Sequence, residues 1–258
     1  MIYRFKWAGI IGLFWATFWL GSTSVIAQIP VKDIVRRADE LMRGKTQQGV
    51  YRMTIIRPDW QRSTEFAFWS EGTEKSFIRI KEPARERGIS FLKIGREMWN
   101  YIPRINRVIK IPPSMMLQSW MGSDFTNDDL VKESSIVDDY THTLLGRETM
   151  GGEDAYKIEF VPKPDAPVAW DHLIEWIRVS DYIPLRTEYF NERDEHIRTL
   201  VFSDIKKMSG RTLPARMKLI EERKPGHSTV LLLEEVTFDR PIDKTVFTKQ
   251  FLRRRSGP

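Results

Sequence analysis

After a single helical segment, the sequence becomes a succession of short stretches in which apolar and polar residues alternate, and this period of two constrains the fold more than any other feature. In 62–69, for example, Thr64, Phe66 and Phe68 share one face of the predicted strand. Such alternation is typical of strands that bury one face. The predicted strands are 50–56, 62–69, 74–81, 89–94, 97–102, 105–111, 140–146, 154–161, 171–180, 184–190, 196–206, 213–223 and 228–238.

Gly, Pro, Asn or Asp stands at the boundaries between these stretches, as expected of hairpin turns. No helical pattern separates one strand from the next, which excludes a parallel sheet built from strand–helix–strand units. The chain is therefore predicted to be mainly β, with one antiparallel sheet curled into a barrel or half-barrel.

Two segments are predicted to be helical. Residues 32–43 place apolar side chains at helical spacing and are followed by Gly44, a common helix stop. Residues 112–132 break the strand rhythm with two prolines, and Thr126 has the spacing of a capped helix start. We expect one or two short helices there which, together with 32–43, cover one face or mouth of the curved sheet.

The first 27 residues have the pattern of a signal peptide. Arg4 and Lys6 precede the apolar run Trp7–Leu20, and Ala27 is a small residue at the expected cleavage site. An uncleaved anchor is the alternative, but 14 apolar residues are fewer than the roughly 20 that cross a bilayer as a helix. We expect export and cleavage after Ala27, which leaves 28–258 as one domain.

Motifs for catalysis or cofactor binding are absent. The sequence has no cysteine, which excludes disulfides, thiolate metal sites and cysteine nucleophiles. It also lacks the signatures of serine hydrolases, P-loop proteins and dinucleotide-binding folds. The four histidines lack the spacing of a metal site: His142, His172, His196 and His227. We predict no metal, no cofactor and no enzymatic activity.

An acidic cluster lies within the predicted helical insert. Asp124, Asp128 and Asp129 lack the alternating ligands of an EF-hand loop, so helix caps and first-turn acids are the favoured interpretation. The adjacent pairs Asp128/Asp129 and Asp138/Asp139 are weak candidates for acid–base catalysis, because neither has an evident partner base.

The net charge of the chain is +6, from 41 Lys+Arg and 35 Asp+Glu, and the positive residues are spread along the sequence. Only Arg253–Arg255 forms a purely basic block. Because the protein is expected to be exported, we predict no nucleic-acid partner. The block is expected to be a solvated tail or to be attracted weakly to anionic lipid headgroups.

Large apolar side chains are abundant on the strands and in the insert. They either fill the concave face of the sheet themselves or line a cavity for an apolar ligand, and the residue pattern leaves both interpretations open. Methionine suits a surface that adapts to variable apolar partners. The candidate lipid-binding residues are Met53, Ile55, Phe66, Phe68, Trp99, Tyr101, Met115, Met116, Leu117, Trp120 and Phe125.

Residues 83–130 contain an ordered series of spaced residues. The series is Arg87-Gly88, Met98-Trp99-Asn100-Tyr101-Ile102-Pro103, Arg107-Val108, Met121-Gly122-Ser123-Asp124-Phe125 and Asp129-Leu130. It resembles the outer-membrane lipoprotein-sorting protein family, a branch of the LolA/LolB-like superfamily. The resemblance extends more loosely over about 30–258.

The resemblance implies an incomplete antiparallel β-barrel (half-barrel) wrapped around a helical plug or lid, with an apolar cavity for acyl chains. It also implies a periplasmic protein of outer-membrane biogenesis with transient membrane contact, and an inner-membrane exporter of the resistance–nodulation–division type as a partner. The first hypothesis is a non-catalytic carrier that binds acyl chains of lipids or lipoproteins for transport between the inner and outer membrane. The alternative is a periplasmic sensor or adaptor of the same fold that binds an envelope protein or the exporter.

Overall fold

The computed structural model describes residues 29–131, 135–164, 166, 168 and 170–254, so the predicted signal peptide lies outside the described residues. The strands are β1 (Thr46–Ile56), β2 (Gln61–Glu71), β3 (Lys75–Glu82), β4 (Ser90–Ile94), β5 (Glu97–Ile102), β6 (Arg107–Ile111), β7 (Tyr140–Met150), β8 (Glu153–Pro162), β9 (His172–Arg178), β10 (Pro184–Phe190), β11 (His196–Met208), β12 (Arg211–Glu221) and β13 (Ser228–Phe238). The helices are α1 (Val31–Arg43), α2 (Asn127–Val131) and α3 (Lys249–Leu252), with 3-10 turns η1 (Pro103–Ile105), η2 (Pro113–Met115) and η3 (Lys244–Phe247).

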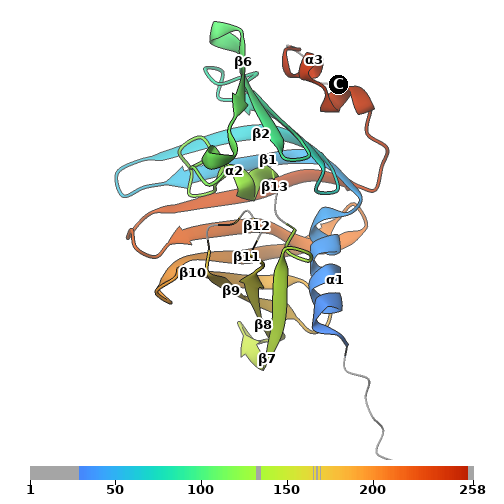
Figure 1. The fold of residues 1–258 in the computed structure, drawn as a ribbon, viewed down its shortest axis with the longest axis vertical. Helices are drawn as coiled ribbons and strands as arrows, with labels where there is room; N and C mark the ends of the chain where they lie inside the picture. Colours follow the sequence, from blue (N-terminus) through green and yellow to red (C-terminus); the bar gives the residue numbers. More distant parts are fainter. Residues whose placement is uncertain (1–28, 132–134, 165, 167, 169, 255–258) are drawn as a thin grey trace, which may run out of the picture.

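The strands form one antiparallel sheet in the order β6-β5-β4-β3-β2-β1-β13-β12-β11-β10-β9-β8-β7. Pairing of β1 with β13 joins the N-terminal hairpins to the C-terminal ones. Within the described ranges, the outer strands β6 and β7 do not pair with each other, so the curved sheet is open (Figure 1). The prediction of a mainly β half-barrel is confirmed.

The predicted strands are all present, and their bounds differ from the prediction by a few residues. The helix predicted at 32–43 is confirmed as α1, and Gly44 follows it. The insert, residues 112–131, is less helical than predicted, because η2 and the short α2 are joined by turns and by a bridge between Ser119 and Thr126. Its two prolines and Gly122, which has a φ of 79°, interrupt the hydrogen bonds that a longer helix would need.

We call the face of the sheet that carries α1 and the insert the inner face, and the opposite one the outer face. The inner face holds two hydrophobic clusters. The central cluster joins the insert to β1–β5, β12 and β13, and includes Met53, Phe66, Phe91, Trp120 and Leu219. The helix cluster packs α1 against β7–β10, and includes Ile34, Val35, Ile158, Phe160 and Leu173.

The outer face is covered at one end by the C-terminal segment, whose helices η3 and α3 the alternating pattern does not predict. Their side chains pack on strands β3–β5 in a cluster that includes Phe77, Leu92, Trp99, Tyr101, Val246, Phe247, Phe251 and Leu252. A four-residue helix such as α3 is too short to show a helical period in the sequence.

Arg79 on β3 holds this C-terminal segment to the sheet. Its Nε donates to the hydroxyl of Ser90 at 3.1 Å, and its Nη2 donates to the carbonyl oxygen of Phe251 at 2.5 Å. The guanidinium lies over the rings of Phe77 and Phe251, at 4.8 and 4.6 Å from their centroids. Burial lowers the pKa of Arg79 to about 10, so the side chain stays charged at neutral pH.

The end of α1 is fixed to the sheet by Arg211 of β12. Arg211 Nη1 donates to the carbonyl oxygens of Glu40 and Leu41, at 2.6 and 3.1 Å, and so satisfies acceptors that a helix end leaves free. Gly44 has a φ of 66°, and a Cβ there would lie 2.9 Å from Asp239 Oδ1. Glycine is therefore needed where the chain leaves α1 and enters β1.

Strands β1 and β13 approach each other closely beside Gly49. A Cβ at this position would lie 2.2 Å from the carbonyl oxygen of Glu235, a distance that no side chain tolerates. The pairing register shifts directly afterwards, between Val50 and Tyr51. The central pairing of the sheet thus depends on a residue without a side chain.

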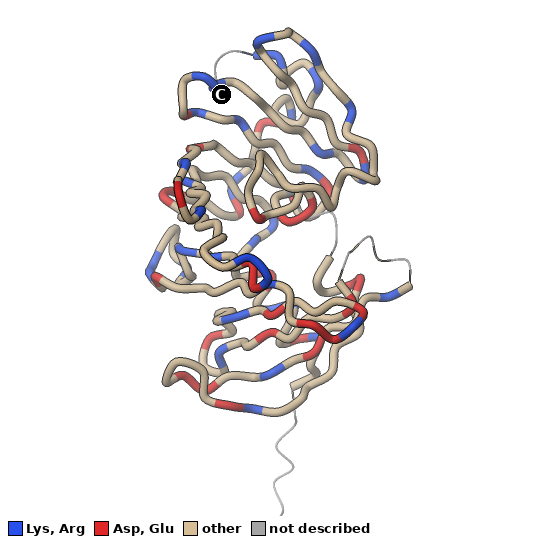
Figure 2. Tube along the Cα trace, turned by 90° about the vertical axis from the view of Figure 1, so that its left-hand side faces the viewer, with Lys and Arg blue, Asp and Glu red and all other residues tan. Residues whose placement is uncertain are grey.

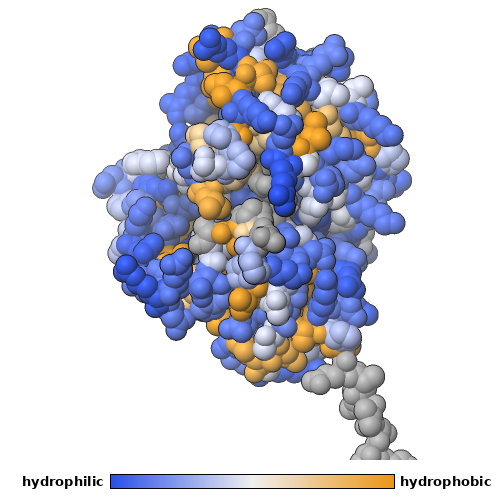
Figure 3. All heavy atoms as spheres, viewed as in Figure 1, coloured by the Kyte–Doolittle hydropathy of each residue, from blue (hydrophilic) through white to orange (hydrophobic). Residues whose placement is uncertain are grey.

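Charged residues of both signs are distributed over the strands and loops (Figure 2). Apolar atoms are exposed near the two outer strands, at the top and bottom of the face seen in Figure 3. They include Ile105 and Ile109 at the β6 edge, and Leu145 and Val161 on β7 and β8. The helices in the described part of the chain are all too short or too polar to cross a bilayer.

Candidate functional site

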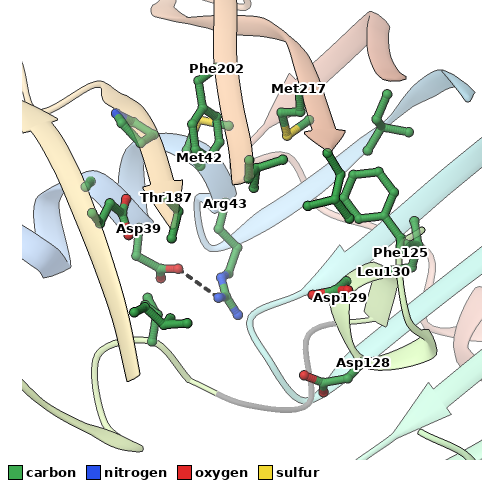
Figure 4. A pocket seen from close by; sticks show the side chains of 18 of the residues that line it. Asp39, Met42, Arg43, Phe125, Asp128, Asp129, Leu130, Thr187, Phe202 and Met217 are labelled. Carbon is green, nitrogen blue, oxygen red and sulfur yellow. Dashed lines mark hydrogen bonds and ion pairs between the residues drawn. The ribbon is translucent and has the colours of Figure 1, made fainter. Parts of the chain in front are cut away.

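A cavity of about 260 Å³ lies on the inner face, where the central cluster and the helix cluster meet. Its walls come from α1, the insert and strands β1, β2 and β9–β13. Figure 4 shows that apolar side chains from these elements face the space, among them Met42, Phe125, Leu130, Phe202 and Met217. The inner face is therefore partly filled by its own side chains and partly hollow.

Trp120 of the insert fills the inner face beside the cavity. It is fully buried and packs against Phe66 and Phe91, with ring centroids 5.4 and 5.3 Å away. Ser123 closes the loop after it, because its hydroxyl donates to the carbonyl oxygen of Trp120 at 2.8 Å. The insert thereby presents Phe125 and Leu130 to the cavity.

Asp124 fastens the insert to strands β1 and β13. Its carboxylate accepts two hydrogen bonds of 3.0 Å from Arg57, which follows β1, and one of 2.6 Å from the hydroxyl of Thr229. Arg57 also donates to the carbonyl oxygen of Gly122 at 3.2 Å. Charge-assisted, two-pronged pairs of this kind fix geometry as well as charge.

Asp129 fastens the other end of the insert to β11. Its two carboxylate oxygens each accept a hydrogen bond of 3.0 Å from Arg198, which also stacks on Trp170 and Tyr189. Burial alone would lower the pKa of Arg198, but the charge and hydrogen bonds of Asp129 together with the nearby Tyr189 and Glu221 outweigh it, and the pKa is raised. Asp129 also accepts from the backbone N–H of Thr126, so the predicted helix cap is present.

The acidic residues Asp124 and Asp129 therefore fix the insert to the sheet at two points. The two aspartates that pair with Arg57 and Arg198 are two of the three acids in the segment Met121–Leu130, whose role the sequence does not define. The carboxylate of Asp129 accepts hydrogen bonds both from the guanidinium of Arg198 and from the backbone N–H of Thr126. This arrangement supports the interpretation as cap and structural acids.

The candidate lipid-binding residues lie in four environments. Three line the cavity: Phe66, Phe68 and Phe125. Four are buried in the central cluster without lining the cavity: Met53, Ile55, Met116 and Trp120. Two lie in the cluster on the outer face: Trp99 and Tyr101. Two are exposed: Met115 and Leu117.

Several cavity residues escape the sequence-based selection. Tyr51 shares its strand face with Met53 and Ile55, and burial raises its pKa, with its hydroxyl accepting a hydrogen bond of 2.8 Å from Gln47. Arg43 and Arg198 are charged, so a search for apolar residues passes over them. The alternation on β12 and β13 signals Met217, Leu219 and Leu231, but only the strand order places them opposite the insert.

An open, curved antiparallel sheet with a mostly apolar hollow beneath a helix and a loop defines a half-barrel protein with an internal cavity. Solved structures share this fold. A DUF1329 family protein from Desulfovibrio piger is 25% identical with a TM-score of 0.77, covering 86% of this chain and 97% of its own.

Two further structures are similarly close. A domain from Vibrio parahaemolyticus described as an outer membrane lipoprotein-sorting protein has a TM-score of 0.76 at 20% identity, covering 86% of this chain and 98% of its own. A LolA superfamily protein from Nitrosomonas europaea has a TM-score of 0.75 at 24% identity, covering 87% of this chain and 100% of its own.

The sequence comparisons agree with the fold. Residues 72–254 match the model of a family described as "Uncharacterized protein". No curated protein matches the sequence. The chain belongs to this family, and its fold is LolA-like, so the resemblance seen in residues 83–130 is confirmed.

Proposed function

We propose that this protein is a non-catalytic carrier that holds acyl chains of lipids or lipoproteins in the cavity of the inner face. The observation that carries the proposal is the mostly apolar hollow of about 260 Å³ beside an otherwise packed core. The names of the relatives from Vibrio parahaemolyticus and Nitrosomonas europaea, which place them among lipoprotein-sorting and LolA proteins, support the same cargo class.

The hydrophobic effect explains why such a cavity can hold an acyl chain. Burial of one CH₂ group is worth about 0.8 kcal/mol, so a 16-carbon chain gains on the order of 12 kcal/mol relative to water. A free lipid is therefore strongly disfavoured in the aqueous space between two membranes. Because the bilayer offers a similar gain, transfer from membrane to protein is close to balanced, and the direction of transfer comes from a partner.

The size of the cavity supports one acyl chain as the occupant. An apolar cavity of about 150 Å³ is enough to bind benzene. A cavity of about 260 Å³ therefore accepts a substantial part of one chain. A longer chain, or a second one, requires the insert or α1 to move outward.

We propose that α1 and the insert together act as the lid of this cavity. Both line it from the side opposite the sheet, and both are tethered at defined points, through Arg211 for α1 and through Arg57 and Arg198 for the insert. In this role they replace the helical plug that the family resemblance implies.

The transport route follows from the expected export. We propose a periplasmic location after cleavage of residues 1–27, with 28–258 as one domain, and transfer between the inner and outer membrane. An inner-membrane exporter of the resistance–nodulation–division type is the proposed partner.

Transient membrane contact is proposed for the β6 edge. Ile105 and Ile109 are exposed there, and Met115 and Leu117 of the insert are exposed as well. The exposed residues Arg104 and Arg107 lie beside them in the sequence. Apolar side chains with a basic rim suit brief insertion into an anionic bilayer surface.

Native mass spectrometry of protein purified without detergent tests the carrier. Lipid is expected to co-purify, and lipid-free protein is expected to take up a fluorescent phospholipid and transfer it between vesicles. Leu145→Asp is the control, since this exposed residue neither lines the cavity nor belongs to the proposed membrane contact. Protein that is empty, takes up no lipid and instead retains an envelope protein in pull-downs would support the adaptor alternative.

A further inference from the structure

The guanidinium of Arg43, at the end of α1, is buried in the wall of the cavity and leaves two of its three nitrogens unpaired within the described part of the chain. The Arg43 side chain is 9% exposed, and its Nη2 donates to Asp39 Oδ1 at 2.8 Å. Its Nε and Nη1 are buried and have no hydrogen-bond partner among the described residues. Figure 4 shows the guanidinium projecting from the helix end into the cavity, between α1 and α2.

The other buried arginines of the sheet are paired more completely, and of Arg198 only the Nε lacks a partner among the described residues. Arg198 and Arg57 each make a two-pronged pair with an aspartate, and Arg79 donates to a hydroxyl and a carbonyl oxygen. Buried N–H groups without acceptors are costly, so a protein rarely keeps them unless something else supplies the acceptor. The unpaired N–H groups of Arg43 lie at the cavity, where a bound cargo would supply the acceptor.

A second unpaired polar group lies on the same wall. Ser70 of β2 lines the cavity, and its hydroxyl is buried without a hydrogen-bond partner. In the strand register Ser70 pairs with Gln47 of β1, and Gln47 follows Arg43 by four residues in the chain. Arg43 and Ser70 thus offer three polar atoms, Nε, Nη1 and Oγ, that have no hydrogen-bond partner among the described residues, in a cavity whose surface is mostly apolar.

The charge around the cavity decides which acceptor suits these donors. Four carboxylates line it, those of Asp39, Asp128, Asp129 and Glu175, against the two guanidiniums of Arg43 and Arg198. The positive charge of Arg43 is already balanced by Asp39, whose Oδ1 accepts a hydrogen bond from it at 2.8 Å, so a cargo group with a full negative charge would meet this carboxylate at close range and be repelled. A neutral carbonyl oxygen accepts hydrogen bonds without that repulsion.

We infer that Arg43 is a specificity-determining residue which donates hydrogen bonds to the carbonyl oxygen of an ester- or amide-linked acyl chain. The inference rests on the proposed function and narrows its cargo to acyl derivatives, in preference to free fatty acids and to alkyl chains without a carbonyl. Ser70 assists by offering its hydroxyl to the same region.

Two lysophosphatidylcholines with the same headgroup and chain length test this, one with an ester-linked hexadecanoyl chain and one with an ether-linked hexadecyl chain. The ester lipid has a carbonyl that the ether lipid lacks. Dissociation constants are measured below the concentration at which either lipid forms micelles. The wild-type protein is expected to bind the ester lipid about tenfold more tightly, the difference that one charge-assisted hydrogen bond supplies.

Arg43→Met is expected to remove that preference while changing the affinity for the ether lipid less than about twofold, because it removes donors and keeps an apolar stem. Arg36→Met, on the exposed side of α1, is the control and should keep the preference. Equal affinities in the wild type, or an equal loss for both lipids in Arg43→Met, would overturn the inference while leaving the carrier intact. Failure of both lipids to bind would overturn the carrier itself. The wild-type comparison stands even if Arg43→Met does not fold.

Discussion

The carboxylate of Asp129 on α2 faces the guanidinium of Arg198 on β11 through two hydrogen bonds of 3.0 Å. The residues are 69 positions apart in the chain, so this pair joins the insert to a distant strand of the sheet. It also forms part of the cavity wall, because both residues line the hollow. The contact that seats the insert thus also shapes the candidate binding site.

Replacing Asp129 by Ala is expected to lower the free energy of unfolding by about 3–5 kcal/mol, because it leaves Arg198 buried without its counter-charge. Denaturant titration gives the measurement. Asp33→Ala is the matched control, since it breaks the exposed pair with Arg36 and should cost less than about 1 kcal/mol. Equal costs for the two variants would show that the buried pair does not hold the insert.

Phe68 and Trp120 are expected to separate binding from stability. Trp120→Ala removes a fully buried side chain from the central cluster and should cost about 3–5 kcal/mol of unfolding free energy. Phe68→Ala removes a ring from the cavity wall and leaves a larger hollow. It should cost less stability than Trp120→Ala and weaken uptake of a fluorescent phospholipid more. The argument fails if Phe68→Ala binds the probe as the wild type does.

Arg79→Lys is expected to release the C-terminal segment from the outer face. The lysine keeps the charge but cannot make both hydrogen bonds or stack on Phe77 and Phe251, and each hydrogen bond to a charged group contributes about 1.5–3 kcal/mol. Limited proteolysis should then cut the segment faster. Arg87→Lys, at an exposed position, is the control, and equal cleavage rates would contradict the prediction.

Gly49→Ala is expected to disrupt the pairing of β1 with β13, since its Cβ would meet the backbone oxygen of Glu235. The backbone must move to accept it, so the loss of stability should clearly exceed that of Gly210→Ala. Gly210 has a positive φ, 81°, but open space around it, so alanine there should cost only about 1–2 kcal/mol. Thermal unfolding ranks the two variants, and a smaller loss for Gly49→Ala would be the contrary result.

Stability is expected to fall at mildly acidic pH because of His142. Its ring donates to the carbonyl oxygen of Ile136 at 2.8 Å, and burial lowers its pKa below the usual 6.5. The unfolded chain therefore binds the proton more readily than the folded protein does. The contribution is complete above about pH 6.5 and is lost as the pH falls through the lowered pKa.

The variant His142→Gln tests this contribution. Glutamine keeps an N–H donor but does not titrate, so the decline in unfolding free energy between about pH 7 and pH 5 should become shallower than in the wild type. Urea titrations at several pH values give both slopes. Identical slopes would show that His142 does not contribute.

The strands could be predicted from the sequence because each one shows its buried face locally, as Thr64, Phe66 and Phe68 do on β2. The division of the candidate residues among four environments could not be predicted from the sequence. Trp99 and Phe66 are both large aromatic residues on strands, yet they lie on opposite faces, because only the order of strands and the position of the C-terminal segment decide which face becomes the cavity wall.

The contacts of the charged residues of the site could not be predicted from the sequence for a different reason. Asp124 and Asp129 follow the pattern of helix caps, and nothing local indicates that Arg57 and Arg198 will meet them across the sheet. Arg43 ends an amphipathic helix, where a basic residue is common. Its unused donors become evident only once the surrounding strands are in place.

Leu200 on β11 packs against both hydrophobic clusters of the inner face. Each cluster is tightly packed within itself, and this residue lies at the seam where the hollow separates them. Because this one residue belongs to the packing of both clusters and also lines the cavity, a change in the bulk of its side chain alters both sides of the hollow at once.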